Sequence, residues 1–127
     1  MKSDTSKQQH LLAVVSAAYT QLPADALVDE CVHPARVRDL VPWASPRDLA
    51  NARLRKVRLR ELCQWFCYAD DAPAACAAYE LAARLVDPEH WAARVFLQDL
   101  AEWLMLPPPE CRRLLVSSAR CGTPQAA

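Results

Sequence analysis

Apolar residues recur every three or four positions along most of the chain, which is the spacing of one face of an α-helix. In the N-terminal part this face consists of Leu11, Leu12, Val15, Ala18 and Tyr19. The spacing predicts a first helix over residues 6–21 and later helices over 72–86, 89–106 and 110–120. The apolar stripe expected in the helix over 89–106 consists of Trp91, Val95, Phe96, Leu100, Trp103 and Leu104. No segment shows the strict alternation typical of a half-buried strand. The pattern therefore predicts an all-α protein.

Helix-start signals support these boundaries. In Ser45-Pro46-Arg47-Asp48 a serine N-cap precedes a proline at the first helical position and an acidic residue at the third. Asp71 before Pro73 and Asp87 before Pro88 give similar signals with aspartate caps. Prolines at 23, 34 and 42 divide the first third into short pieces, with short helices expected over 24–32 and 35–40.

The segment that starts at Ser45 predicts the longest helix, over residues 46–69, with two apolar sides. One side would consist of Ala50, Leu54, Val57, Trp65 and Tyr68, and the other of Ala52, Leu59, Leu62, Cys63 and Phe66. We expect this helix to be central, with an antiparallel helical hairpin over 72–106 packed against it. The predicted fold class is a single compact bundle of five to seven helices. One domain would span residues 1–127, with frayed ends at 1–5 and 121–127.

Composition supports one ordinary domain. The chain has 127 residues, of which 53% are hydrophobic, enough for a continuous core. Its 15 basic and 15 acidic residues balance to a net charge of zero. This balance argues against a dedicated nucleic-acid-binding protein, which usually carries a positive excess.

The six cysteines could form three disulfides in a secreted protein, but they lie mostly within apolar helical stretches, where free cysteine packs as a small hydrophobe. Residues 11–18 resemble the core of a signal peptide, although polar residues 8–10 separate them from the preceding lysines. No run approaches the length of a membrane-spanning helix. The chemistry thus favours reduced cysteines, a cytoplasmic location and no membrane partner.

Sites for catalysis or metals are weakly supported. Cys63, Cys67 and Cys76 with a histidine could bind zinc, but their spacing matches no zinc finger or ribbon, and core packing is the simpler interpretation. The histidines are isolated in the sequence, and a single glycine argues against a phosphate-binding loop. We therefore expect a non-enzymatic protein with no cofactor, no metal and no catalytic residue.

The one charge asymmetry lies in residues 47–60, where Arg47, Arg53, Arg55, Lys56, Arg58 and Arg60 face a single acid, Asp48. Three interpretations are open: a solvated stripe paired with acids on neighbouring helices, a docking surface for an acidic protein, or a DNA-recognition helix. Two points argue against DNA recognition: the basic residues point in several directions, and the helix is expected to be central.

Trp43 belongs to no clear apolar stripe. As the residue outside the helix cap, it could form a hydrophobic staple onto Leu49 or Ala50. It could instead be an exposed anchor for a partner, since tryptophan and arginine dominate interface hot spots. The predicted partner-binding residues are Trp43, Arg53, Arg55, Lys56, Arg58 and Arg60.

Residues 60–103 carry Trp65-Phe66-Cys67, then an alanine-rich helix with Tyr79, then Asp87-Pro88 at the opening of the next helix. In this third of the chain the sequence resembles small uncharacterised all-helical bacterial proteins encoded beside type VI secretion genes. The resemblance implies an accessory or adaptor role in a secretion apparatus and implies no catalytic residues.

The function expected from the sequence is a non-enzymatic protein-binding module, acting as an adaptor, chaperone or accessory factor with an acidic protein partner. A small DNA-binding transcription regulator that uses helix 47–60 is the first alternative, and a toxin-neutralising or inhibitor protein is the second. A homodimer is a further option, because an alanine-rich helix pair can pack against a second copy of itself.

Overall fold

The computed structural model describes residues 2–22, 31–32, 34–87 and 89–122. Within these residues the chain forms seven helices and no strand, which confirms the all-α prediction. The helices are α1 (Lys2–Gln21), α3 (Pro34–Leu40), α4 (Pro46–Arg55), α5 (Leu59–Leu62), α6 (Ala72–Leu85), α7 (Trp91–Leu104) and α8 (Pro108–Gly122).

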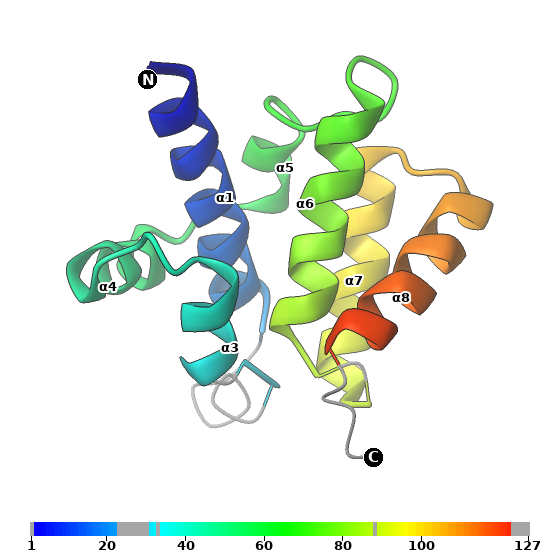
Figure 1. Cartoon of the computed structure of the whole chain (residues 1–127). Helices are drawn as coiled ribbons and strands as arrows, with labels where there is room; N and C mark the ends of the chain where they lie inside the picture. The colour runs from blue at the N-terminus through cyan, green and yellow to red at the C-terminus, as the bar shows by residue number, and fades with distance from the viewer. Residues whose placement is uncertain (1, 23–30, 33, 88, 123–127) are drawn as a thin grey trace.

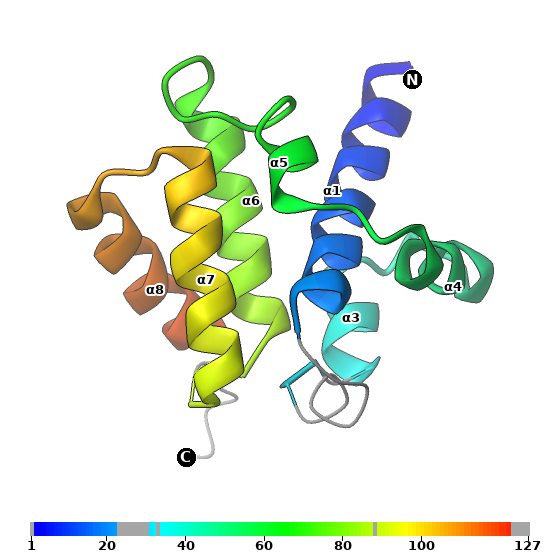
Figure 2. The ribbon, with the colours of Figure 1, turned by 180° about the vertical axis from the view of Figure 1, so that it is seen from behind.

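Helix α6 occupies the middle of the bundle and contacts α1, α3, α7 and α8 (Figure 1). Helix α1 lies beside it and carries α4 and α5 on its other sides. As Figure 2 shows from behind, α4 and α8 lie at opposite edges of the molecule. Helices α6 and α7 run antiparallel, which confirms the predicted hairpin over 72–106. The central helix is therefore α6.

Helices α1 and α6 are interior because both carry many small side chains that are buried in the core. Residues 13–18 of α1 are all buried, and so are the alanines of α6 at positions 75, 78, 82 and 83. Small side chains allow helix axes to approach closely, so that leucines and Phe96 from neighbouring helices fill the space between them. Phe96, Leu62, Leu85, Leu100 and Leu104 are among the largest side chains that are fully buried.

Cys31, Val32 and Arg36 are joined by hydrogen bonds to the link between α6 and α7. Val32 and Val86 form an isolated antiparallel bridge, and the amide of Asp87 donates to the carbonyl of Cys31 at 2.8 Å. The guanidinium of Arg36 donates to the carbonyl of Val86 at 3.1 Å. These contacts anchor α3 against the lower end of the helical hairpin. The short helix predicted over 24–32 falls mainly on residues outside the described part of the chain.

The prediction of one central helix over residues 46–69 is wrong. Helix α4 ends at Arg55, α5 spans only Leu59–Leu62, and turns follow up to Asp71. Leu59, Leu62 and Phe66 are buried as expected, but Ala50 and Leu54 are exposed, Leu54 to 75%. The first half of the segment is therefore peripheral apart from the buried Ala52 and Val57, and the large core side chains of the segment come from its second half.

The apolar stripe predicted for residues 89–106 is wrong in part. Phe96, Leu100 and Leu104 are buried, but Trp91, Val95 and Trp103 are 57%, 49% and 44% exposed. Helix α7 thus buries one face against its neighbours and presents further apolar side chains to solvent.

The remaining boundaries differ by a few residues, as helix ends usually do. Helix α1 begins at Lys2 rather than near residue 6, and α8 spans 108–122 rather than 110–120. None of the helices in the described ranges combines the length and apolarity that crossing a membrane requires.

Candidate functional site

The start of α4 is fixed by a reciprocal cap. The amide of Asp48 donates to the hydroxyl of Ser45 at 3.1 Å, and the amide of Ser45 donates to the Asp48 carboxylate at 3.0 Å. Together with Pro46 at the first position, this is the capping box that the sequence predicts. The single acid inside the basic segment thus has a structural task at the helix N-terminus.

The end of α4 is fixed by a residue far away in the sequence. Lys56 adopts a left-handed conformation, with φ of 55°, and the next amide, that of Val57, donates to the Ser16 hydroxyl at 3.1 Å. Both Ser16 and Val57 are buried. Because Val57 is drawn into the core at this point, the chain leaves the helical path and α4 remains on the surface of α1.

All six basic side chains of the segment are exposed: Arg47, Arg53, Arg55, Lys56, Arg58 and Arg60. We call these six residues the basic surface. Two acids accompany them, Asp48 in the cap and Glu61, whose carboxylate accepts from the Arg58 amide at 3.5 Å. The segment 47–61 therefore keeps a local positive excess on a chain whose net charge is zero.

Aromatic rings hold two of these arginines in place. The guanidinium carbon of Arg53 lies 5.2 Å from the ring centroid of Tyr19, and that of Arg55 lies 6.0 Å from the ring of Trp65. His10 stacks on Trp65 with a centroid distance of 5.0 Å. Such cation–π contacts are worth about 0.5–1 kcal/mol at exposed sites. They restrict the orientations of both guanidinium groups before any partner arrives.

A shallow groove of about 170 Å³ runs between α1 and α4, beside the basic surface. It is lined by Gln9, Leu12, Asp48, Asn51, Ala52 and Arg55. Its lining combines the apolar side chains of Leu12 and Ala52 with amide and charged side chains. Such a groove can accept a single side chain of a protein partner but is too small for most enzyme substrates.

Trp43 lies just before α4 and is 38% exposed. Leu49 packs against the core, whereas Ala50 faces solvent. The staple onto Leu49 or Ala50 stays a prediction. The residue as a whole is therefore partly accessible to a partner.

His10, Tyr19 and Trp65 are neighbours of the basic surface that the sequence pattern does not predict. Tyr19 and Trp65 are components of predicted apolar stripes, and His10 has no motif around it. Their proximity to Arg53 and Arg55 depends on how α1 and α4 cross, which no local pattern encodes. Only the excess of arginine over acid marked the region beforehand.

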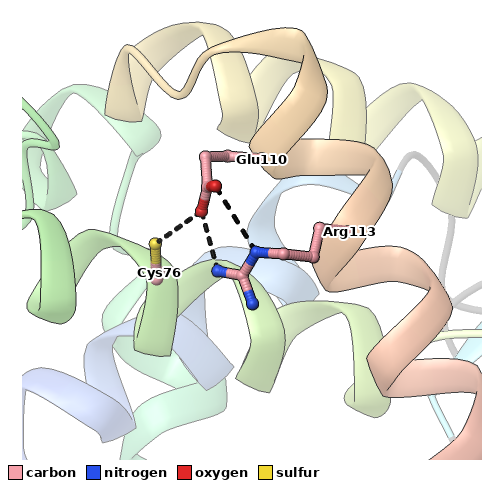
Figure 3. A network of polar contacts seen from close by, with 3 residues as sticks. All are labelled: Cys76, Glu110 and Arg113. Atoms are coloured by element: carbon pink, nitrogen blue, oxygen red, sulfur yellow. Dashed lines mark hydrogen bonds and ion pairs between the residues drawn. The ribbon is translucent and has the colours of Figure 1, made fainter.

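A second polar cluster joins α6 and α8 (Figure 3). The Cys76 thiol lies 3.8 Å from a carboxylate oxygen of Glu110, which is also 2.7 Å from the Arg113 guanidinium. Burial raises the pKa of Cys76, and the charge of Glu110 raises it further. Burial likewise raises the pKa of Cys111. Both thiols therefore remain protonated at neutral pH, which makes them poor nucleophiles.

The zinc alternative finds no geometric support in the described residues. Among them no group of three or more histidine, cysteine or acidic side chains is placed to hold a metal. Cys63, Cys67, Cys76 and Cys111 are free thiols. The Cys67 thiol lies 3.8 Å from the sulfur of Met105, and Cys63 lies in the turn that follows α5.

His90 has a structural task at the start of α7. It is the N-cap of α7, and its Nδ1 atom accepts from the Ala92 amide at 3.2 Å. Asp87, the cap predicted from the sequence, accepts from the Glu89 amide at 3.0 Å instead. The helix consequently begins at Trp91, two residues after the predicted start.

Comparison with protein-family models, with curated proteins and with solved structures found no match to this chain. The site must therefore be interpreted from its own geometry and charge.

Proposed function

We propose that the protein is a non-enzymatic protein-binding module whose basic surface docks an acidic protein. The observation that carries the proposal is the mixture of side chains around α4. Six exposed basic residues accompany two exposed apolar ones, Trp43 at 38% before the helix and Leu54 at 75% near its end. Protein interfaces favour this combination of arginine with large apolar side chains.

The charge of the basic surface indicates the sign of the charge on the partner. Since the chain as a whole is neutral, the positive excess of residues 47–61 is local and would orient an acidic partner toward this one edge. Rim charges of this kind act mainly on the association rate and on specificity, and salt weakens their effect. The arginines held over Tyr19 and Trp65 reduce the conformational entropy lost on binding.

The biological setting proposed is that of an adaptor, chaperone or accessory factor of a bacterial system, and cytoplasmic. A secretion apparatus is the setting that the resemblance over residues 60–103 suggests. An inhibitor or toxin-neutralising role remains the alternative within the same class, since it too would use a protein-binding surface.

The test compares two variants with equal changes in charge. Lys56→Glu with Arg60→Glu reverses two residues of the basic surface, and Arg38→Glu with Arg112→Glu reverses two exposed residues elsewhere. Immobilised wild-type protein, incubated with lysate of the source organism, should retain an acidic protein that mass spectrometry identifies. With that purified partner, we expect the first variant to bind at least tenfold more weakly and the control to bind like wild type.

Two results would count against the proposal. Equal affinity of the wild type and the Lys56/Arg60 variant would exclude the basic surface as the contact. A captured partner with a basic binding face would contradict the electrostatic argument. Circular dichroism of each variant establishes that the fold is intact.

A DNA-binding regulator is the second candidate, and one structural observation favours it. Helix α4 is peripheral and solvent-exposed, so the objection that a central helix cannot enter a groove no longer applies. The exposed Leu54 and the zero net charge still favour a protein partner. Mobility-shift titration of a random DNA duplex decides between them. A shift that weakens steeply with salt would favour DNA, because phosphate contacts release counterions.

A further inference from the structure

The outer face of α7 carries a row of exposed side chains. Trp91 and Val95 of α7 are 57% and 49% exposed, and Arg94, Gln98 and Glu102 are exposed on the same helix. Met105, the left-handed C-cap residue directly after α7, continues the row and is 62% exposed. We call these six residues the α7 stripe. Figure 2 shows α7 at the front of the rear view, with no other helix in front of it. Positions 91, 94, 95, 98 and 102 recur every three or four residues within α7, so the row follows the helix axis.

The charged side chains along the stripe are placed so that two copies running in opposite directions would be complementary to each other. Gln98 lies at the centre, with Arg94 four residues before it and Glu102 four residues after it. At 1.5 Å per residue, each charge lies about 6 Å from Gln98 along the axis. If two copies of α7 pair antiparallel about a two-fold axis at Gln98, Arg94 of each copy faces Glu102 of the other.

The remaining positions fit the same register. Trp91 of one copy lies opposite Met105 of the second, where a thioether can contact an aromatic ring. The two Gln98 amides meet at the axis, and an amide both donates and accepts hydrogen bonds. A polar residue at one central position is a known device for fixing helix register. A parallel pair would instead bring Arg94 against Arg94, so the charges select the antiparallel arrangement.

We propose that the chain forms an antiparallel homodimer through the α7 stripe. The contact is isologous, because the same residues serve both copies, and it closes after two subunits. One helix pair buries a small area compared with standard protein interfaces, so we expect a reversible dimer with a micromolar dissociation constant. The proposal is independent of the basic surface.

Sedimentation equilibrium from about 1 µM to about 1 mM protein tests the association. The wild-type mass should rise with concentration from 14.2 kDa toward twice that value. Arg94→Glu alone and Glu102→Arg alone should each weaken dimerisation at least tenfold, because each places like charges together twice per dimer. Arg38→Glu, an exposed reversal outside the stripe, should leave the dissociation constant unchanged.

The decisive arm mixes the two weakened variants. An equimolar mixture of Arg94→Glu and Glu102→Arg restores opposite charges at both contacts, so a heterodimer should form with affinity close to that of wild type. The double variant should recover a homodimer for the same reason. A wild-type chain that stays monomeric, single variants that dimerise like wild type, or a mixture that fails to associate would each overturn the proposal. If the α7 stripe binds a different protein instead of a second copy, the wild-type chain alone would stay monomeric in these runs.

Discussion

The hydroxyl of Ser16 determines where α4 ends. It is buried in α1 and accepts the amide of Val57, which is 41 positions away in sequence and buried as well. Losing one partner of a buried hydrogen bond leaves the other without compensation for its lost hydration. The position of the basic surface at the edge of the molecule therefore depends on one small side chain inside it.

Replacing Ser16 by alanine should lower the free energy of unfolding by about 1–3 kcal/mol, because the Val57 amide would be buried without an acceptor. Urea unfolding monitored by circular dichroism measures the change. Thr20→Val provides a control, since the Thr20 hydroxyl donates only to the carbonyl of Ser16 within the same helix. A loss below about 0.5 kcal/mol for Ser16→Ala would mean that water replaces the hydroxyl at this site.

Lys56 is one of two non-glycine residues with positive φ in the described part of the chain. A left-handed conformation costs an ordinary residue about 1 kcal/mol, and glycine avoids that penalty. Lys56→Gly should therefore raise the free energy of unfolding by up to about 1 kcal/mol. Arg55→Gly, one position earlier and inside α4, should lower it by a similar amount. Equal effects of both substitutions would contradict the conformational argument.

Trp43 and Trp103 offer a matched pair for the binding hypothesis, since they are 38% and 44% exposed. Trp43→Ala should weaken binding of the captured partner by about tenfold, the effect of removing one aromatic anchor. Trp103→Ala on α7 should leave that affinity unchanged. Isothermal calorimetry with the purified partner measures the affinity of both variants. A larger loss of affinity for Trp103→Ala than for Trp43→Ala would place the contact on the α7 side of the molecule.

At the scale of elements, the starts of helices were easier to predict than their ends. Ser45 and Asp71 cap α4 and α6 as expected, because an N-cap is formed by residues three positions apart. The end of α4 depends instead on Ser16 and on a left-handed lysine, neither of which has a local signal. The apolar periodicity of a helix does not show whether a neighbouring helix covers each apolar position. For this reason the pattern predicted Trp91 and Val95 in the core, although both are exposed.

The packing of α6 against α8 predicts how stability changes in alkali. Burial raises the pKa of Tyr79 from 10.0 to about 12, and it raises the pKa of Cys76 and Cys111 as well. Above about pH 9 the unfolded chain therefore binds fewer protons than the folded one, and the free energy of unfolding falls as pH rises. This stabilisation is fully present below the pKa values of the unfolded chain. It is lost as pH rises through the higher pKa values of the folded protein.

Urea unfolding at several values between pH 8 and about pH 12 should show this decline. Tyr79→Phe removes one of the ionising groups, so its stability should fall less steeply above pH 10 than that of the wild type. The alanine variant of Cys76 should flatten the lower part of the curve. Parallel curves for the wild type and Tyr79→Phe would exclude the buried tyrosine as a source of the decline.

At the scale of the whole molecule, α4 lies at the edge of the molecule away from α7, whereas α5, which carries Arg60, packs against α7 (Figure 2). A dimer formed through α7 would leave the α4 part of the basic surface accessible in both copies. Two linked surfaces can engage a repeated acidic segment with an avidity above that of one surface. The affinity for a bivalent partner should therefore fall in the Arg94→Glu variant, whereas the affinity for a single acidic segment should not.

Hydrogen exchange of the protein with and without its purified partner tests the central claim most directly. Exchange read by mass spectrometry locates amides that become protected on binding. We predict protection in residues 46–61, which include α4 and the link to α5, and little change in α8. Protection confined to α7 and α8, with 46–61 unchanged, would contradict the assignment of the basic surface as the partner-binding site.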